Sequence, residues 1–218
     1  MTSWEEHVDR EVGRYEDGEV RLSAIAAADE RQRQLTRMGN AAGGAGLALL
    51  MLDRDEEAET WFARAAERYR ESFPEAPPGS WGRPIGAVKA RLLAGDWPGA
   101  EDAARWALTT GCPGADSPIG RYAACLALLV LDRDEEAGPF AASIQGRDDF
   151  PTDVADALAA LAAADGNAYA AAVTSVLRSF ETRDDYLEDI PVADTVIVLQ
   201  VLAARRGLDV RLSSELLP

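Results

Sequence analysis

Histidine and cysteine are nearly absent from this chain, so it has few of the bases, nucleophiles and metal ligands that enzymes use most. The only histidine is His7, expected on an exposed helix, and the only cysteines are Cys112 and Cys125. Neither cysteine has a histidine beside it, which favours free thiols in a reducing compartment. Catalytic, phosphate-binding, zinc and calcium-loop motifs are also missing. The sequence therefore predicts no catalytic residue, no metal site and no cofactor.

Basic residues are scarce as well. The chain has 22 lysines and arginines against 38 aspartates and glutamates, a formal net charge of −16, and its only lysine is Lys89. Nucleic-acid binding needs a basic surface that displaces counterions, so we expect no direct binding to nucleic acid. An acidic, alanine-rich and almost lysine-free chain resembles the cytoplasmic proteins of salt-in halophiles, which implies that the charge suits a salty solvent. Recruitment of a basic partner by this charge is the alternative.

The chain also lacks an apolar run long enough to cross a membrane. Its longest runs lie at 122–131 and 190–204, and the second is interrupted by Asp194 and Gln200. A membrane-spanning helix needs about 20 consecutive apolar residues. The first residues are acidic where a signal peptide needs a positive segment. We therefore expect a cytoplasmic protein that makes no contact with membranes.

Aromatic residues make up only 7% of the chain, and β-branched residues are sparse, whereas alanine is abundant. This composition favours helices over strands. Residues 47–58 return almost unchanged as residues 126–137, with Met51 replaced by Val130. Such a repeat within one chain is typical of stacked helical units that bury their apolar faces against one another. We predict an all-α fold of about 9–11 helices in one domain over residues 1–218.

Each unit has an apolar helix, a short acidic or Gly-Asp turn, and a second amphipathic helix. We place about four such helical hairpins within residues 40–182, the last with its turn at 164–168. Residues 1–39 are expected to form one or two N-terminal helices. Residues 190–206 are expected to form an unusually apolar C-terminal capping helix with Pro191 in its first turn.

The residues around these turns resemble the tetratricopeptide repeat. The residues that match it are Gly46, Ala48, Glu57, Ala58, Phe62 and Ala65, and then Gly95, Trp97, Ala100 and Ala107. Ile85-Gly86 and Ile119-Gly120 lie 34 residues apart, which is the period of that family. The resemblance covers about residues 40–180 and implies a right-handed stack of antiparallel helical hairpins, an α-solenoid that binds proteins. The chain departs from the family in spacing, since Ala58, Ala100 and Ala137 are 42 and 37 residues apart.

The segment 73–84 is the longest expected loop and contains Trp81 and Arg83, residue types that are common at binding hot spots. Lys89 and Arg121 lie on the first helices of neighbouring hairpins, with Tyr122 beside Arg121. The candidate partner-binding residues are therefore Trp81, Arg83, Lys89, Arg121 and Tyr122. The alternatives are a rigid connector in which Trp81 fills the space between units, and simple pairing of the cations with nearby carboxylates.

Together these features predict a non-catalytic adaptor that presents a groove or the 74–84 loop to a protein partner. One alternative is an enzyme or small-molecule binder with a cleft between hairpins, although no carboxylate pair stands out among the acids. The other alternative is a structural homo-oligomer joined through residues 190–206.

Overall fold

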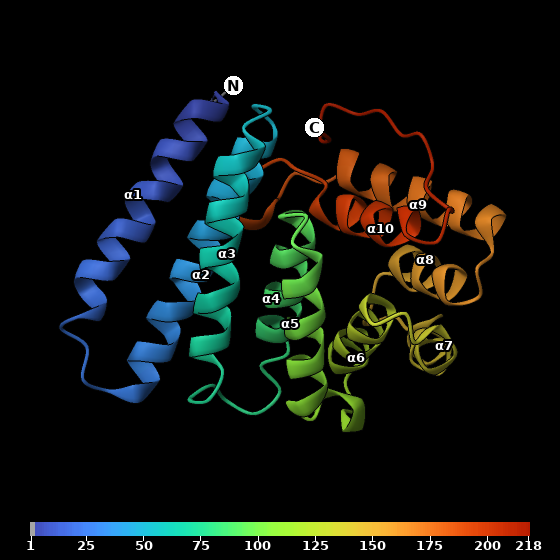
Figure 1. Cartoon of the computed structure of the whole chain (residues 1–218), viewed down its shortest axis with the longest axis horizontal. Helices are drawn as coiled ribbons and strands as arrows, with labels where there is room; N and C mark the ends of the chain where they lie inside the picture. The colour runs from blue at the N-terminus through green and yellow to red at the C-terminus, as the bar shows by residue number, and fades with distance from the viewer. Residues whose placement is uncertain (1–2) are drawn as a thin grey trace.

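The computed structural model describes residues 3–218, and within this part of the chain the regular elements are all helices, without a strand (Figure 1). Its ten α-helices are α1 (Trp4–Leu22), α2 (Ala28–Leu50), α3 (Asp55–Ser72), α4 (Gly82–Leu93), α5 (Trp97–Thr109), α6 (Pro118–Val130), α7 (Asp134–Ile144), α8 (Thr152–Ala162), α9 (Gly166–Glu181) and α10 (Asp194–Ala204). Two short 3-10 helices are η1 (Cys112–Gly114) and η2 (Leu187–Asp189). Helices that follow one another from α1 to α9 pack together. The all-α prediction is confirmed.

The two copies of the internal repeat adopt the same conformation. In both, the turn that follows the helix contains an aspartate in the left-handed backbone region, Asp53 with φ 56° and Asp132 with φ 53°. The N–H of the following arginine donates to the carbonyl five residues earlier at 3.0 Å in each copy. This bond satisfies a carbonyl that the helix end would otherwise leave without a partner. We call this arrangement the repeated turn.

The charged side chains of the two copies also agree. Arg54 donates two hydrogen bonds of 2.7 Å to Glu57, and Arg133 donates two of 2.6 Å to Glu136. Both glutamates lie in the first turn of the following helix, where negative charge is stabilised by the free N–H groups. The acidic run in each copy therefore has a local structural explanation.

The repeated turn also ends α4, α8 and α10, at Gly95, Ala164 and Gly207. In all four helices that follow such a turn, the fifth, ninth and twelfth residues after the left-handed position are buried. These residues are Ala58, Phe62 and Ala65, then Ala100, Ala104 and Ala107, then Ala137, Ala141 and Ile144, and finally Tyr169, Val173 and Val176. In the fourth unit the buried residue is Tyr169, whereas Ala168, where we expected the turn to end, is exposed.

The expected boundaries differ from the observed ones at both ends. The boundary between residues 39 and 40 falls inside α2, so the first paired helix begins at Ala28 rather than after residue 39. At the C-terminal end the helix begins at Asp194, and Pro191 lies in the preceding non-helical segment.

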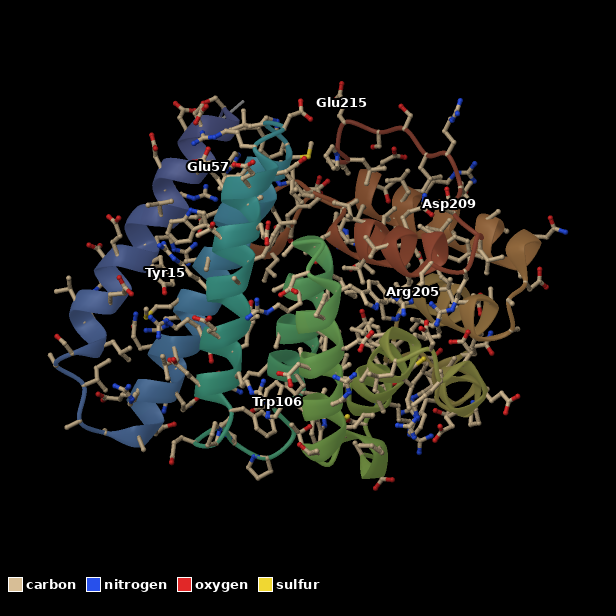
Figure 2. The ribbon with its side chains drawn as sticks, in the orientation of Figure 1. Tyr15, Glu57, Trp106, Arg205, Asp209 and Glu215 are labelled. Carbon is tan, nitrogen blue, oxygen red and sulfur yellow. The ribbon has the colours of Figure 1, made fainter. Side chains whose placement is uncertain are left out.

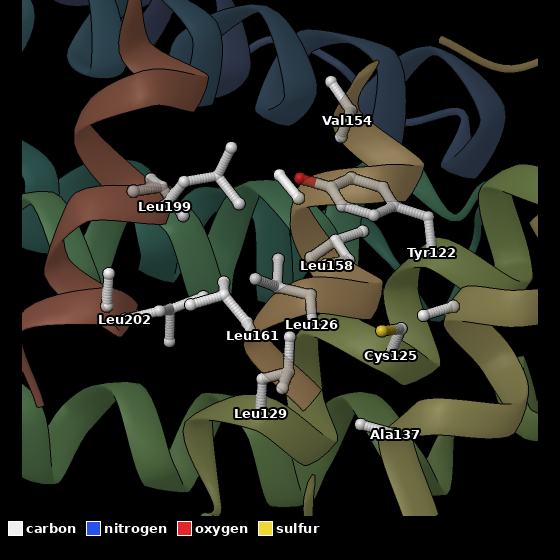
Figure 3. Close-up of a cluster of buried hydrophobic side chains, with 14 of the residues drawn as sticks. Tyr122, Cys125, Leu126, Leu129, Ala137, Val154, Leu158, Leu161, Leu199 and Leu202 are labelled. Carbon is white, nitrogen blue, oxygen red and sulfur yellow. The ribbon is translucent and has the colours of Figure 1, made fainter. Parts of the chain in front are cut away.

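The apolar helix α10 is buried within its own chain. It packs against α4, α8 and α9, and Figure 3 shows Leu199 and Leu202 beside Leu158 and Leu161 of α8. Val198 is only 1% exposed. The apolar surface that we expected to join two copies through residues 190–206 is therefore already covered. No helix within residues 3–218 is both long enough and apolar enough to cross a membrane.

The segment before α10 crosses to the other end of the molecule. Ile190 and Val192 are buried in a core with α1, α2 and α3, whereas α10 belongs to the core formed by α4 to α9. After α10, Arg205, which is labelled in Figure 2, donates a hydrogen bond of 2.7 Å to the carboxylate of Asp132 in the repeated turn between α6 and α7. The C-terminal segment thus lies against α2, α4 and α8 and contributes side chains to both cores.

Candidate ligand pocket

A pocket of ≈ 400 Å³ lies between α2 and α4, with α3 as its floor. Farther along the chain the corresponding helices touch directly, α4 with α6 and α6 with α8, whereas α2 and α4 make almost no direct contact. The loop before α4 and the 3-10 helix η2 complete the walls. Among the lining residues are Thr36, Asn40, Leu47, Phe62, Tyr69 and Leu93.

Glycines on the facing helices make the pocket possible. A Cβ on Gly86 of α4 would lie 2.7 Å from the ring of Tyr69, and one on Gly39 of α2 would lie 3.0 Å from the same ring. The tyrosine ring therefore packs against both backbones and sets the distance between α2 and α4. A Cβ on Gly43 would meet no atom within 4 Å, so this glycine faces open space in the pocket. The neighbouring Gly44, by contrast, packs against the side chain of Glu11.

A chain of hydrogen bonds fixes the polar groups on one side of the pocket. The hydroxyl of Tyr69 donates to Asn40 at 2.9 Å, and the amide of Asn40 donates to Glu188 at 2.9 Å. Glu188 also forms an ion pair with Arg14 of α1. Burial raises the pKa of Tyr69 far above its ordinary value, so its hydroxyl stays protonated and remains a donor.

Lys89 lines the pocket but already has a partner. Its ammonium group forms an ion pair with Asp194 at the start of α10 and donates to the hydroxyl of Thr195 at 3.2 Å. Burial alone would lower the pKa of Lys89, but the Asp194 carboxylate reverses this effect and raises it above the ordinary value. The C-terminal segment therefore neutralises the cation that we expected to contact a protein partner.

Arg83 differs from Lys89 because no carboxylate lies beside it. Its Nε donates to the hydroxyls of Thr36 at 3.1 Å and Ser72 at 3.0 Å, and its Nη2 donates to the side-chain oxygen of Gln32. All three acceptors are neutral, and Gln32 and Ser72 are buried. Burial lowers the pKa of Arg83, although an arginine remains charged under any ordinary condition. The pocket thus contains one oriented positive charge that has no negative partner in the described chain.

Trp81 lines the pocket and also packs between units. It packs against a small core formed by Cys112, Ala123 and Ala124, and a Cβ on Gly120 of α6 would lie 2.8 Å from its indole nitrogen. The indole therefore packs between the loop and α6, as the connector alternative proposed, and Trp81 also lines the pocket.

The other two candidate residues lie outside this pocket. Arg121 lines a smaller hollow beside α6, where its Nε donates to the carbonyl of Ala115 at 3.4 Å. Tyr122 is buried, with its ring 5.5 Å from the ring of Phe150. The structure therefore brings together Trp81, Arg83 and Lys89, but not Arg121 and Tyr122.

Sequence reasoning missed Asn40, Tyr69 and Glu188 as pocket residues. Asn40 and Glu188 are 148 positions apart, and no periodic pattern connects residues at such a distance. The available signal was the group of glycines at 39, 43, 44 and 86, since glycine is costly inside a helix unless something packs closely against it.

The histidine and the cysteines take no part in the pocket. His7 is buried rather than exposed, and its Nδ1 has no hydrogen-bond partner among the described residues. Burial raises the pKa of Cys112 to about 11 and that of Cys125 to about 12, which makes both thiols poor nucleophiles. Residues 3–218 contain no group of three or more histidine, cysteine or acidic side chains placed to hold a metal ion. In comparisons with known proteins, the chain matches no family model, no curated protein and no solved structure.

Proposed function

We propose that this protein is a non-catalytic binding protein that holds a small ligand in the pocket between α2 and α4. The single observation that carries the proposal is the pocket itself, at ≈ 400 Å³ with largely apolar walls and a few fixed polar groups. Small-molecule sites commonly measure about 300–1,000 Å³ and have this mixed lining. The framework we propose for it is a right-handed stack of antiparallel hairpins similar to tetratricopeptide repeats.

The arrangement of the C-terminal segment supports a pocket rather than an open groove. Asp194 forms an ion pair with Lys89. Glu188 forms an ion pair with Arg14 and accepts a hydrogen bond from Asn40. Partner groups that a bound peptide would need are thus used within the chain.

A protein adaptor, which the sequence first favoured, is the second candidate. It is supported by Leu187, a pocket residue that is 64% exposed and so presents an apolar group to solvent at the mouth.

A pair of glycine substitutions tests the proposal. Gly43→Leu places a side chain in the open space of the pocket, whereas Gly13→Leu places the same side chain on α1, where a Cβ also meets no atom within 4 Å. Both changes replace a helical glycine by a better helix former, so neither is expected to impair folding. A panel of neutral bicyclic aromatic fragments is screened by ligand-observed NMR. We expect fragments that bind the unmodified protein and Gly13→Leu but not Gly43→Leu.

The proposal is wrong if no fragment binds the unmodified protein. It is also wrong if every bound fragment binds Gly43→Leu with unchanged affinity, because the site would then lie elsewhere.

A further inference from the structure

We infer that the ligand of this pocket is a small amphipathic monoanion, an organic carboxylate whose charged group contacts Arg83 and whose apolar body lies along α2 and α4. The inference rests on the proposed function and adds the chemical class of the ligand. It is carried by the unneutralised charge of Arg83, its position in the pocket, and the apolar character of the remaining walls.

The guanidinium of Arg83 is oriented before any ligand arrives. The hydroxyl of Thr36 donates to the carbonyl of Gln32 at 2.9 Å, and that of Ser72 donates to the carbonyl of Tyr69 at 2.8 Å. Both hydroxyl oxygens are therefore turned to accept from Arg83, and they hold its Nε without neutralising it. Nη1 donates no hydrogen bond within residues 3–218 and remains free for an external acceptor.

The charge of Arg83 is unusual in this chain. Acidic residues outnumber basic ones by 38 to 22, and most of the partly buried cations pair with a carboxylate. Arg83 is partly buried, and a partly buried positive charge without a carboxylate leaves part of its desolvation cost uncompensated. An anionic ligand would provide that compensation. The N-terminus of α4 adds to the attraction, since Arg83 is its second residue and the N–H of Gly82 donates no hydrogen bond within the described chain.

The surrounding acids limit the ligand to one negative charge. Glu188 and Asp194 also line the pocket, and their partners Arg14 and Lys89 balance them without leaving an excess of positive charge. A second negative charge on the ligand would find no free cation in the pocket and would face these two carboxylates. A carboxylate also matches the planar donors of a guanidinium better than a spherical ion does.

The shape of the pocket calls for an apolar body behind the charged group. Arg83 and Leu93 stand at opposite ends of α4, ten residues apart, which corresponds to about 15 Å along a helix. Leu47 of α2 and Phe62 of α3 line the pocket as well, and both are buried. A ligand anchored at Arg83 therefore extends over apolar side chains and glycine backbone.

The test compares naphthylacetate with naphthylacetamide, its neutral isostere, by isothermal titration calorimetry at pH 7. We expect the unmodified protein to bind the acid about tenfold or more tightly than the amide, because a hydrogen bond to a charged group contributes more than a neutral one. Arg83→Gln should abolish this preference without changing the affinity for the amide, and Arg83→Lys should restore part of it. Arg121→Gln, which removes an arginine outside the pocket, should leave the preference intact.

The outcomes distinguish a failure of this inference from a failure of the proposed pocket function. If the unmodified protein binds naphthylacetate and naphthylacetamide with equal affinity, the inference is overturned. This comparison uses the unmodified protein alone and so does not depend on the folding of any variant. If Gly43→Leu still abolishes that binding, the pocket function stands without an anionic ligand. If the preference for the acid survives Arg83→Gln but not Arg121→Gln, the anion site belongs to the hollow beside α6 and the assignment to Arg83 is wrong.

Discussion

The repeated turn offers a test that compares two sites within the same molecule. Ala164 and Gly95 occupy equivalent left-handed positions, with φ 53° and 67°, at the ends of α8 and α4. A Cβ on Gly95 would meet no atom within 4 Å, and Ala164 is exposed, so packing does not enter the comparison. Exchanging the two residue types, by Ala164→Gly and Gly95→Ala, should therefore change stability through the backbone alone.

The expected magnitude follows from two opposing effects. A Cβ in the left-handed region costs roughly 1–2 kcal/mol. Glycine in turn loses more backbone entropy on folding, which costs about 0.4–1 kcal/mol. We therefore expect Ala164→Gly to raise the free energy of unfolding by about 0.5–1 kcal/mol, and Gly95→Ala to lower it by a similar amount.

Urea denaturation followed by circular dichroism measures this difference. With a slope of about 2 kcal/mol per molar urea, the midpoints should move by roughly 0.3–0.5 M in opposite directions. Ala163→Gly is the control, because Ala163 precedes the turn with φ −87° and has no left-handed strain to relieve. That control should be destabilised. The reasoning is refuted if Ala164→Gly is destabilised as much as the control, since the left-handed alanine would then carry no cost.

Three further predictions concern buried ionisable groups. Lys89→Met should lower the free energy of unfolding by about 2–3 kcal/mol because Asp194 loses its partner, and adding Asp194→Leu should recover part of that loss in chemical denaturation. Burial lowers the pKa of His7 below 6.5, so the unfolded chain takes up the proton first and stability is lost as the pH falls through 6.5. Between pH 7.5 and pH 5.5, His7→Gln should therefore lose less stability than the unmodified protein, and equal losses would contradict the burial of this ring. The thiol of Cys125, with its pKa raised to about 12, should resist iodoacetamide at pH 8 until urea unfolds the chain, as followed by mass spectrometry.

Local features of the fold were predictable because they depend on residues close in sequence. The repeated turn at 47–58 and 126–137 is held by a backbone hydrogen bond and by an arginine–glutamate pair three residues apart, so equal sequences give equal turns. The boundary expected at residue 40 was wrong for a physical reason. Several glycines near that position weaken a helix locally, but the aromatic rings of Phe62 and Tyr69 need them for close packing, and tertiary contact keeps α2 continuous.

The course of the C-terminal segment could not be predicted in the same way. An apolar helix must be buried, but its sequence does not specify which surface covers it. A second copy of the chain and the chain's own core could cover α10 equally well. The choice depends on contacts between distant residues, such as Lys89 with Asp194 and Asn40 with Glu188. Both contacts cross from the first half of the chain to the last quarter.

The candidate site was partly predictable from residue type. Trp81, Arg83 and Lys89 were singled out as a tryptophan and two cations near a loop, and they do line one pocket. Their roles, however, depend on their neighbours. Lys89 is neutralised by Asp194, Trp81 packs between units, and only Arg83 faces the pocket with an unbalanced charge.

This distribution of charge connects the fold to the proposed ligand. Two acids of the C-terminal segment, Glu188 and Asp194, pair with Arg14 of α1 and Lys89 of α4, but the segment brings no acid to Arg83. The same segment contributes Leu187 and Glu188 to the pocket wall. The C-terminal segment that lies against α2 and α4 therefore forms part of the wall of a partly open pocket. The ligand that we propose for this pocket would therefore be small and would place its one negative charge against Arg83.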